Sequence, residues 1–254
     1  VQGRADGVGV VGELGQGAPV GGEQFGGQAR PDVLHAHHPT VLPVALRAAR
    51  RIRAGGRPCI VVYDARENYA GIPAEEQGNP RRHAVLLRQE ERSMAGVAAV
   101  LTVSEPIADV LQERYHLATR PTVLLNAPPY VAEPSVQTTP SLRAVLGLDP
   151  AVPLLVYSGG ISRARGIEVL VDALAHLPEV HLALVTVPFP HPMAAALRAR
   201  AAELGAAERL HLVPPVGQGE LIAFLASADV ALHPLPGGSP NHDQALPNKL
   251  FEYL

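Results

Sequence analysis

Several residue types are scarce in this sequence, and each shortage narrows what the protein can do. Among 254 residues there are one cysteine, Cys59, one lysine, Lys249, and no tryptophan. A single cysteine provides neither an internal disulfide nor a cysteine zinc site. Because Cys59 lies within an apolar run, we expect it to be an inert core residue in a reducing compartment.

Long apolar runs and a strong net charge are also missing. No run approaches the roughly 18 to 20 apolar residues of a membrane-spanning helix, and the N-terminus lacks the basic-then-apolar order of a signal peptide. The formal net charge of −3 gives no support to a nucleic-acid surface. We expect a cytoplasmic protein that binds no nucleic acid, and peripheral contact of the full-length protein with the inner face of a membrane stays open.

The composition itself is that of a globular protein. Hydrophobic residues make up 47% of the chain and charged residues 18%. The length suffices for one large core or two cores of about 100 to 150 residues each. The chain begins with Val1 and stops at Leu254 inside an expected helix, so we expect a fragment truncated at both ends.

Strands and helices are expected to alternate along the chain, which predicts an α/β protein with two Rossmann-like, doubly wound parallel sheets. The second, C-terminal domain is expected to be incomplete. The expected strands are 8–11, 32–37, 58–63, 96–103, 121–125, 153–157, 181–186, 209–213 and 230–233. The expected division is a Gly-rich, flexible lead-in at 1–30, an N-terminal domain at 31–130, a Pro-rich linker at 131–150 and a C-terminal domain at 151–254.

Residues 154–174 predict a strand, a glycine turn and a helix. The turn holds Gly159 and Gly160, and the loop that follows holds Arg163 and Arg165. Glycine lets backbone N–H groups approach a ligand, a helix start adds a positive dipole end, and arginine adds full charge. The stretch therefore suits a phosphate, although such turns also occur as plain structure in α/β proteins.

Residues 235–254 predict a matching second element. A Gly- and Pro-rich loop precedes a helix expected from Pro247, where a missing N–H costs nothing. Lys249 and Glu252 are three positions apart and share one face of that helix. Together with the first loop they would hold a diphosphate, while Glu252 accepts hydrogen bonds from sugar hydroxyls. The alternative is a solvated surface pair.

Histidines cluster at the end of the strand expected at 32–37. His35 and His37 point to one face of that strand, which raises the question of a metal. No carboxylate or cysteine lies nearby in the sequence, so we expect no metal and assign His35, His37 and His38 to an acceptor pocket. Farther on, the charged run at 87–92 predicts a solvated helix face.

Short motifs follow one another in a recognisable order. Residues 32–129 contain DVLHAH, YDARENYAG, VLTVSEPIADVL and PTVLLNAPP, and residues 157–254 contain YSGGISRARGIEVLVDAL, LIAFLASADVALHPL and LPNKLFEYL. The ordered set resembles family four of the retaining glycosyltransferases, which have the GT-B fold with two domains facing a cleft. The resemblance implies hexosyl transfer from a UDP- or GDP-type nucleotide sugar to a glycan, lipid or small-molecule acceptor. It also implies that no metal or other cofactor is needed.

The resemblance assigns roles to individual positions. Donor binding falls on Gly159, Gly160, Arg163, Arg165, Gln244, Asn248, Lys249 and Glu252, and catalysis on Asp64, Glu67, Arg165 and Lys249. Arg165 stands where the family usually has lysine and keeps its charge. Three positions depart further: Gly160 replaces a second basic residue, Gln244 the earlier of two paired glutamates, and Arg66 a common histidine.

Two other readings remain open. One is a GT-B epimerase or phosphorylase, although a phosphorylase needs a pyridoxal lysine and the only lysine, Lys249, suits a diphosphate contact better. The other is a catalytically degenerate relative that binds a nucleotide sugar or glycan without turnover. The substitutions at Gly160, Gln244 and Arg66 favour this second reading.

Overall fold

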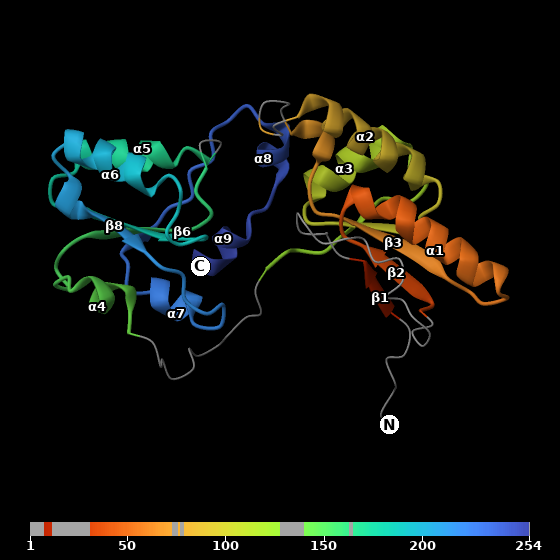
Figure 1. Ribbon diagram of the computed structural model, residues 1–254, viewed down its shortest axis with the longest axis horizontal. Helices are drawn as coiled ribbons and strands as arrows, with labels where there is room; N and C mark the ends of the chain where they lie inside the picture. The colour runs from red at the N-terminus through yellow and green to blue at the C-terminus, as the bar shows by residue number, and fades with distance from the viewer. Residues whose placement is uncertain are drawn as a thin grey trace, which may run out of the picture. The chain divides into compact units, whose positions relative to one another are not determined.

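The computed structural model describes residues 8–11, 31–72, 76, 79–127, 140–162 and 165–253 (Figure 1). The chain divides into two compact units. Unit 1 comprises Val1–Asn126 and Gly238–Leu246, and unit 2 comprises Ala127–Gly237 and Pro247–Leu254. Within the described residues, no helix is both long and apolar enough to cross a membrane.

Unit 1 is built on a parallel sheet with the strand order β1-β2-β3-β4-β5. Its strands are β1 Val8–Val11, β2 Val33–Ala36, β3 Ile60–Ala65, β4 Ala99–Thr102 and β5 Thr122–Val123. Its helices are α1 Leu42–Ala54, α2 Pro80–Met94, α3 Glu105–Tyr115 and α8 Pro240–Gln244. Because consecutive strands are neighbours and parallel crossovers are right-handed, α1, α2 and α3 lie on one face of this sheet.

Burial alternates along the strands of unit 1, as expected for a sheet with helices on one face. Leu34, Val61 and Tyr63 are buried and belong to the core under α1 and α3. The intervening residues point to the opposite face, where His35 and Asp64 are half-buried. The polar side chains at the strand ends therefore lie outside this core.

Glu90 on α2 is an exception to the polar surface of that helix. Its side chain is only 1% exposed and accepts hydrogen bonds from the Tyr63 and Tyr115 hydroxyls, each at 2.7 Å. Burial raises the pKa of this carboxyl, and the two hydroxyl donors work against that rise. The prediction of a solvated face at 87–92 is therefore wrong at Glu90, whereas Glu91 is exposed.

Unit 2 is built on a parallel sheet with the strand order β8-β7-β6-β9. Its strands are β6 Leu154–Gly159, β7 His181–Thr186, β8 Leu210–Val213 and β9 Val230–Ala231. Its helices are α4 Leu142–Leu146, α5 Ile167–Ala173, α6 Ala194–Glu203, α7 Leu221–Leu225 and α9 Asn248–Tyr253. The chain steps outward from β6 to β8 and then returns to the other side of β6, which is the doubly wound arrangement.

Helices cover both faces of the sheet in unit 2 (Figure 1). Along β7, Leu182 and Leu184 belong to one core cluster with residues of α5 and α6. Ala183 and Val185 belong to a second cluster with residues of α4 and α7. Because successive strand residues point to opposite faces, an apolar strand fills both cores. The predicted α/β architecture of two parallel Rossmann-like sheets is confirmed.

The segment Gly238–Leu246 departs from the expected domain division. The C-terminal domain was expected to run unbroken through 151–254, whereas this segment groups with unit 1. It also contains α8, where a loop was expected. The signal for α8 is Ser239 before Pro240: the Ser239 hydroxyl accepts from the His242 N–H at 3.4 Å, and proline suits the first helical turn.

The expected lead-in lies mostly outside the described residues, and the expected linker lies partly outside them. Of the lead-in at 1–30, the structure describes β1, whose backbone pairs in parallel with β2. Of the linker at 131–150, it describes 140–150, which includes α4 of unit 2. Leu142 of α4 is fully buried in unit 2, so this part of the expected linker is structurally part of that unit.

Candidate functional site

The strand order of unit 2 marks where a ligand is expected to bind. In open parallel sheets, ligands occupy the crevice at the carboxyl ends of the strands where the winding reverses. In unit 2 this reversal falls at β6 and its neighbour β9. Gly159 ends β6, and the chain after β9 leads to α9.

Lys249 of α9 lies directly against Gly159. A β-carbon built on Gly159 would come within 2.5 Å of the Lys249 Cε and 2.7 Å of its Nζ. Gly159 also has a φ of +130°, a conformation that residues with side chains rarely adopt. The strand end therefore requires glycine, and its missing side chain makes room for the ammonium group.

Arg165 and Glu252 complete a charged group around Lys249. Burial lowers the pKa of Lys249, the Glu252 carboxylate raises it, and the Arg165 guanidinium lowers it. Glu252 Oε2 is buried and has no hydrogen-bond partner among the described residues. Two cations and one unsatisfied carboxylate oxygen thus lie close together. That they hold a diphosphate and a sugar hydroxyl stays a prediction.

Two tyrosines that sequence reasoning missed support this group. The Tyr157 hydroxyl donates to the Gly160 carbonyl at 2.7 Å and accepts from Arg165 Nη1 at 3.4 Å. The Tyr253 hydroxyl accepts from the Ser158 N–H at 3.0 Å, and burial raises the pKa of Tyr253 to about 12. These bonds hold the glycine turn and α9 in place.

The remaining residues predicted to bind the donor have different surroundings. Gly160 is half-buried, and a β-carbon there would meet its nearest atom, the Val187 carbonyl oxygen, at 3.7 Å. Asn248 is exposed at the first position of α9. Arg163 lies outside the described residues.

Gln244, which the sequence also assigned to donor binding, belongs to unit 1. Its Oε1 accepts from Asn68 Nδ2 at 2.8 Å, and its carbonyl oxygen accepts from the Ser104 hydroxyl at 2.6 Å. The Asn68 N–H donates to Asn241 Oδ1 at 2.8 Å. These bonds attach α8 to unit 1.

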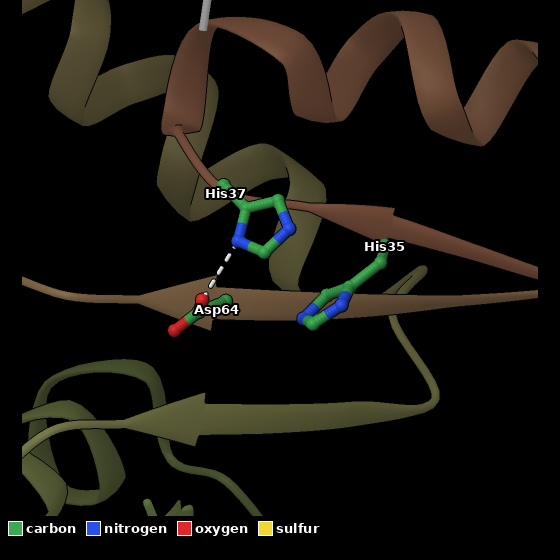
Figure 2. A group of neighbouring side chains, drawn as sticks. All are labelled: His35, His37 and Asp64. Carbon is green, nitrogen blue, oxygen red and sulfur yellow. Dashed lines mark hydrogen bonds and ion pairs between the residues drawn. The ribbon is translucent and has the colours of Figure 1, made fainter. Parts of the chain in front are cut away.

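His35, His37 and Asp64 lie together at the ends of β2 and β3 in unit 1 (Figure 2). Asp64 Oδ2 and His37 Nδ1 share a hydrogen bond of 2.7 Å, and the rings of His35 and His37 are 4.1 Å apart. Burial, followed by the neighbouring His37, lowers the pKa of His35. Sequence reasoning found no carboxylate beside the histidines, whereas the parallel pairing of Ala36 with Tyr63 brings Asp64 alongside His37.

The other residues predicted on unit 1 lie around this cluster. Arg66 is exposed, and its Nε donates to Asp64 Oδ2 at 3.3 Å. Glu67 is exposed in the loop after β3. The ring of His38 turns to the backbone instead: its Nδ1 accepts from the Thr40 N–H at 3.2 Å, and its ring meets Tyr69 edge-on.

The N-terminal part of the chain is similar to a known family. Residues 23–127 match the family model described as Glycosyltransferase Family 4. Over these residues the chain is similar to Glycosyltransferase Family 4. The resemblance stated from the motifs is thereby confirmed.

Curated relatives carry a consistent name. The D-inositol 3-phosphate glycosyltransferase of Xylanimonas cellulosilytica is 30% identical over 165 residues, covering 61% of this chain and 39% of the relative. The enzyme of the same name from Mycolicibacterium gilvum is 37% identical over 94 residues, covering 36% of this chain and 21% of the relative. The chain therefore spans well under half the length of these curated relatives.

Solved structures support the fold. Sucrose-phosphate synthase from Thermosynechococcus elongatus matches with a TM-score of 0.61 at 17% identity, covering 85% of this chain and 54% of the other. HepE from Anabaena, solved in complex with UDP-glucose, matches with a TM-score of 0.59 at 21% identity, covering 82% and 54%. At these identities the likeness concerns the α/β fold.

Proposed function

We propose that this chain is part of a retaining glycosyltransferase, which transfers a hexose from a nucleotide-diphosphate sugar to an acceptor hydroxyl. The observation that carries this proposal is the placement of Lys249 over Gly159, with Arg165 and Glu252 beside it, at the winding reversal of unit 2. The family match over 23–127 and the curated relatives support transferase chemistry. A UDP donor is favoured because structural neighbours were solved with UDP or UDP-glucose.

The cation pair accounts for how the leaving group would be stabilised. Lys249 and Arg165 face a diphosphate, and negative charge on it grows as the bond from the anomeric carbon to the phosphate oxygen breaks. The acceptor oxygen bonds to the anomeric carbon on the same face, and the acceptor hydroxyl proton passes to the departing phosphate oxygen. Because α5 and α9 are short, side-chain charge supplies most of this stabilisation. No metal or cofactor enters the proposed step.

Glu252 and the polar cluster of unit 1 have separate roles in this proposal. The unsatisfied Glu252 Oε2 accepts a hydrogen bond from a sugar hydroxyl of the donor. On unit 1, His37 and Asp64 bind the acceptor, whose chemical class can be a glycan, a lipid or a small molecule. We propose that the protein works in the cytoplasm, at times in contact with the inner face of a membrane.

Turnover of a defined donor tests the proposal. The chain is incubated with UDP-glucose or GDP-mannose and a panel of polyol, polyol-phosphate and glycan acceptors, with and without a chelator. We expect release of the nucleoside diphosphate, a product with the anomeric configuration of the donor, and equal rates in both conditions. Inversion of configuration, or activity that depends on added divalent metal, would contradict the proposed mechanism.

A binding protein without turnover is the second candidate function. Gln244 carries no charge where the family has a carboxylate, and its amide is held by Asn68 in unit 1. Saturable binding of UDP-glucose without release of UDP would favour the binding protein over the transferase. Gln244→Glu then becomes informative, because a transferase limited by the missing carboxylate gains activity and a binding protein does not.

A further inference from the structure

We propose that His35, His37 and Asp64 form a binding site for one divalent transition-metal ion of the zinc class. One possible ligand atom from each side chain lies within 4.8 Å of the others. Two imidazoles and one carboxylate form a ligand set typical of zinc, cobalt and ferrous iron in proteins. The binding of the ion does not depend on the transferase proposal, and a bound ion would compete with an acceptor for His37 and Asp64.

The fold places the three ligands by simple strand geometry. His35 and His37 are two positions apart and share a face of the chain at the end of β2 (Figure 2). Asp64 is on the adjacent parallel strand, on the same half-buried face of the sheet. Two neighbouring strands therefore supply all three ligands, which makes the site rigid in its backbone.

An unsatisfied nitrogen is a second sign that something binds here. The Nε2 atom of His35 is buried and has no hydrogen-bond partner among the described residues. A buried polar atom without a partner is costly unless a ligand or water satisfies it.

The contact between His37 and Asp64 shows how an ion would enter. Their Nδ1 and Oδ2 atoms are 2.7 Å apart and share one proton. An ion in place of that proton requires these atoms to separate to about 3.3 Å, since each bond to zinc is about 2.0 to 2.1 Å. Both side chains are partly solvent-exposed, at 21% and 16%, and have room for this shift.

The Arg66 guanidinium contacts two of the three proposed ligands and should weaken binding of the ion. Its Nε is 3.3 Å from Asp64 Oδ2, and its Nη2 is 3.4 Å from His37 Nδ1. A guanidinium at this place repels a divalent cation and occupies the carboxylate that would bind it. The Arg66 side chain is 53% exposed, so it can swing into solvent when the ion binds.

Direct metal titration of the purified full chain tests the site. Zn²⁺ is added in competition with a chromogenic indicator, and Co²⁺ is followed by its visible absorption, each on metal-free protein. We expect one equivalent to bind in the wild type, and His35→Gln and His37→Gln to weaken it at least about tenfold. The matched control His38→Gln should bind as the wild type does, because His38 turns to Thr40.

The variant Arg66→Gln should bind Zn²⁺ more tightly than the wild type. A variant that merely failed to fold would not show this gain in affinity. Removing the guanidinium should tighten Zn²⁺ binding by about tenfold. Melting temperatures without metal verify that each variant is folded. The proposal is overturned if no equivalent binds, if His38→Gln weakens binding as much as His37→Gln, or if Arg66→Gln leaves the affinity unchanged.

Discussion

The ammonium group of Lys249 occupies the space that a side chain on Gly159 would need. This contact joins the two stretches of sequence that each predicted half of a phosphate site. It places them in one unit, at the point where the sheet reverses its winding. Gly159, Arg165, Lys249 and Glu252 all belong to unit 2.

Gly159→Ala should damage the donor site, whereas Gly160→Ala should not. The new methyl group at 159 meets Lys249 at 2.5 Å and forces a φ of +130° on alanine. At 160 the nearest atom is 3.7 Å away, which is an ordinary contact. We expect a loss of about 1 to 3 kcal/mol in stability and weaker UDP binding for Gly159→Ala alone. Equal effects of both substitutions in thermal melts and UDP titrations would refute this role of Gly159.

The pH dependence of UDP binding should report the lowered pKa of Lys249. The protonated ammonium attracts the diphosphate, so affinity is full below this pKa and falls as pH rises through it. Because burial lowers the pKa from its usual 10.5, the fall begins at a lower pH than for an exposed lysine. Lys249→Arg should remove this step, since arginine stays charged. Ionisation of UDP itself affects the titrations of wild type and Lys249→Arg equally. Superimposable pH profiles of the two proteins would therefore show that the step does not come from Lys249.

Gln244→Leu should destabilise the attachment of α8 to unit 1. It removes the acceptor for Asn68 Nδ2, and Asn68 is only 5% exposed. A buried donor without a partner costs about 1 to 3 kcal/mol. Gln244→Glu keeps an acceptor and should cost less, and Asp243→Ala, at an exposed neighbour, should cost little. Urea unfolding measures the three free energies, and a loss for Asp243→Ala as large as that for Gln244→Leu would count against this bond.

Glu90→Gln should change how stability depends on pH. The pKa of Glu90 is raised in the folded state above its usual value of about 4.5. Its contribution to stability is therefore fully present below that usual value and is lost as pH rises through the folded pKa. Glu90→Gln should remove this dependence, and Glu91→Gln, at an exposed neighbour, should retain it. The free energies of unfolding of the three proteins are measured between pH 4 and pH 8. Parallel curves for wild type and Glu90→Gln would contradict the role given to Glu90.

Local patterns were enough to predict most elements of the fold. The strands expected at 8–11 and 181–186 coincide with β1 and β7, and the strand expected at 209–213 contains β8. Apolar periodicity and capping residues are local properties, so the sequence alone reveals them. The same holds for the grouping of Lys249 with Arg165, because each follows a strand end of the same sheet.

Contacts between distant segments could not be predicted in this way. Asn68 and Asn241 are separated by 173 positions, and nothing in either stretch signals the bond between them. Asp64 reaches His37 only through the register of two parallel strands. Glu90 looks like its exposed neighbours in sequence, and only the two tyrosines above it explain its burial.

The affinity for UDP of three proteins tests the central claim most directly. Wild type, Lys249→Met and Arg198→Met are titrated with UDP by calorimetry at neutral pH; Arg198 is an exposed residue of α6 and serves as the control for loss of one positive charge. We predict that Lys249→Met weakens binding by about 10-fold to 100-fold and that Arg198→Met leaves it unchanged. Equal affinities for wild type and Lys249→Met would contradict a nucleotide-diphosphate site at Lys249.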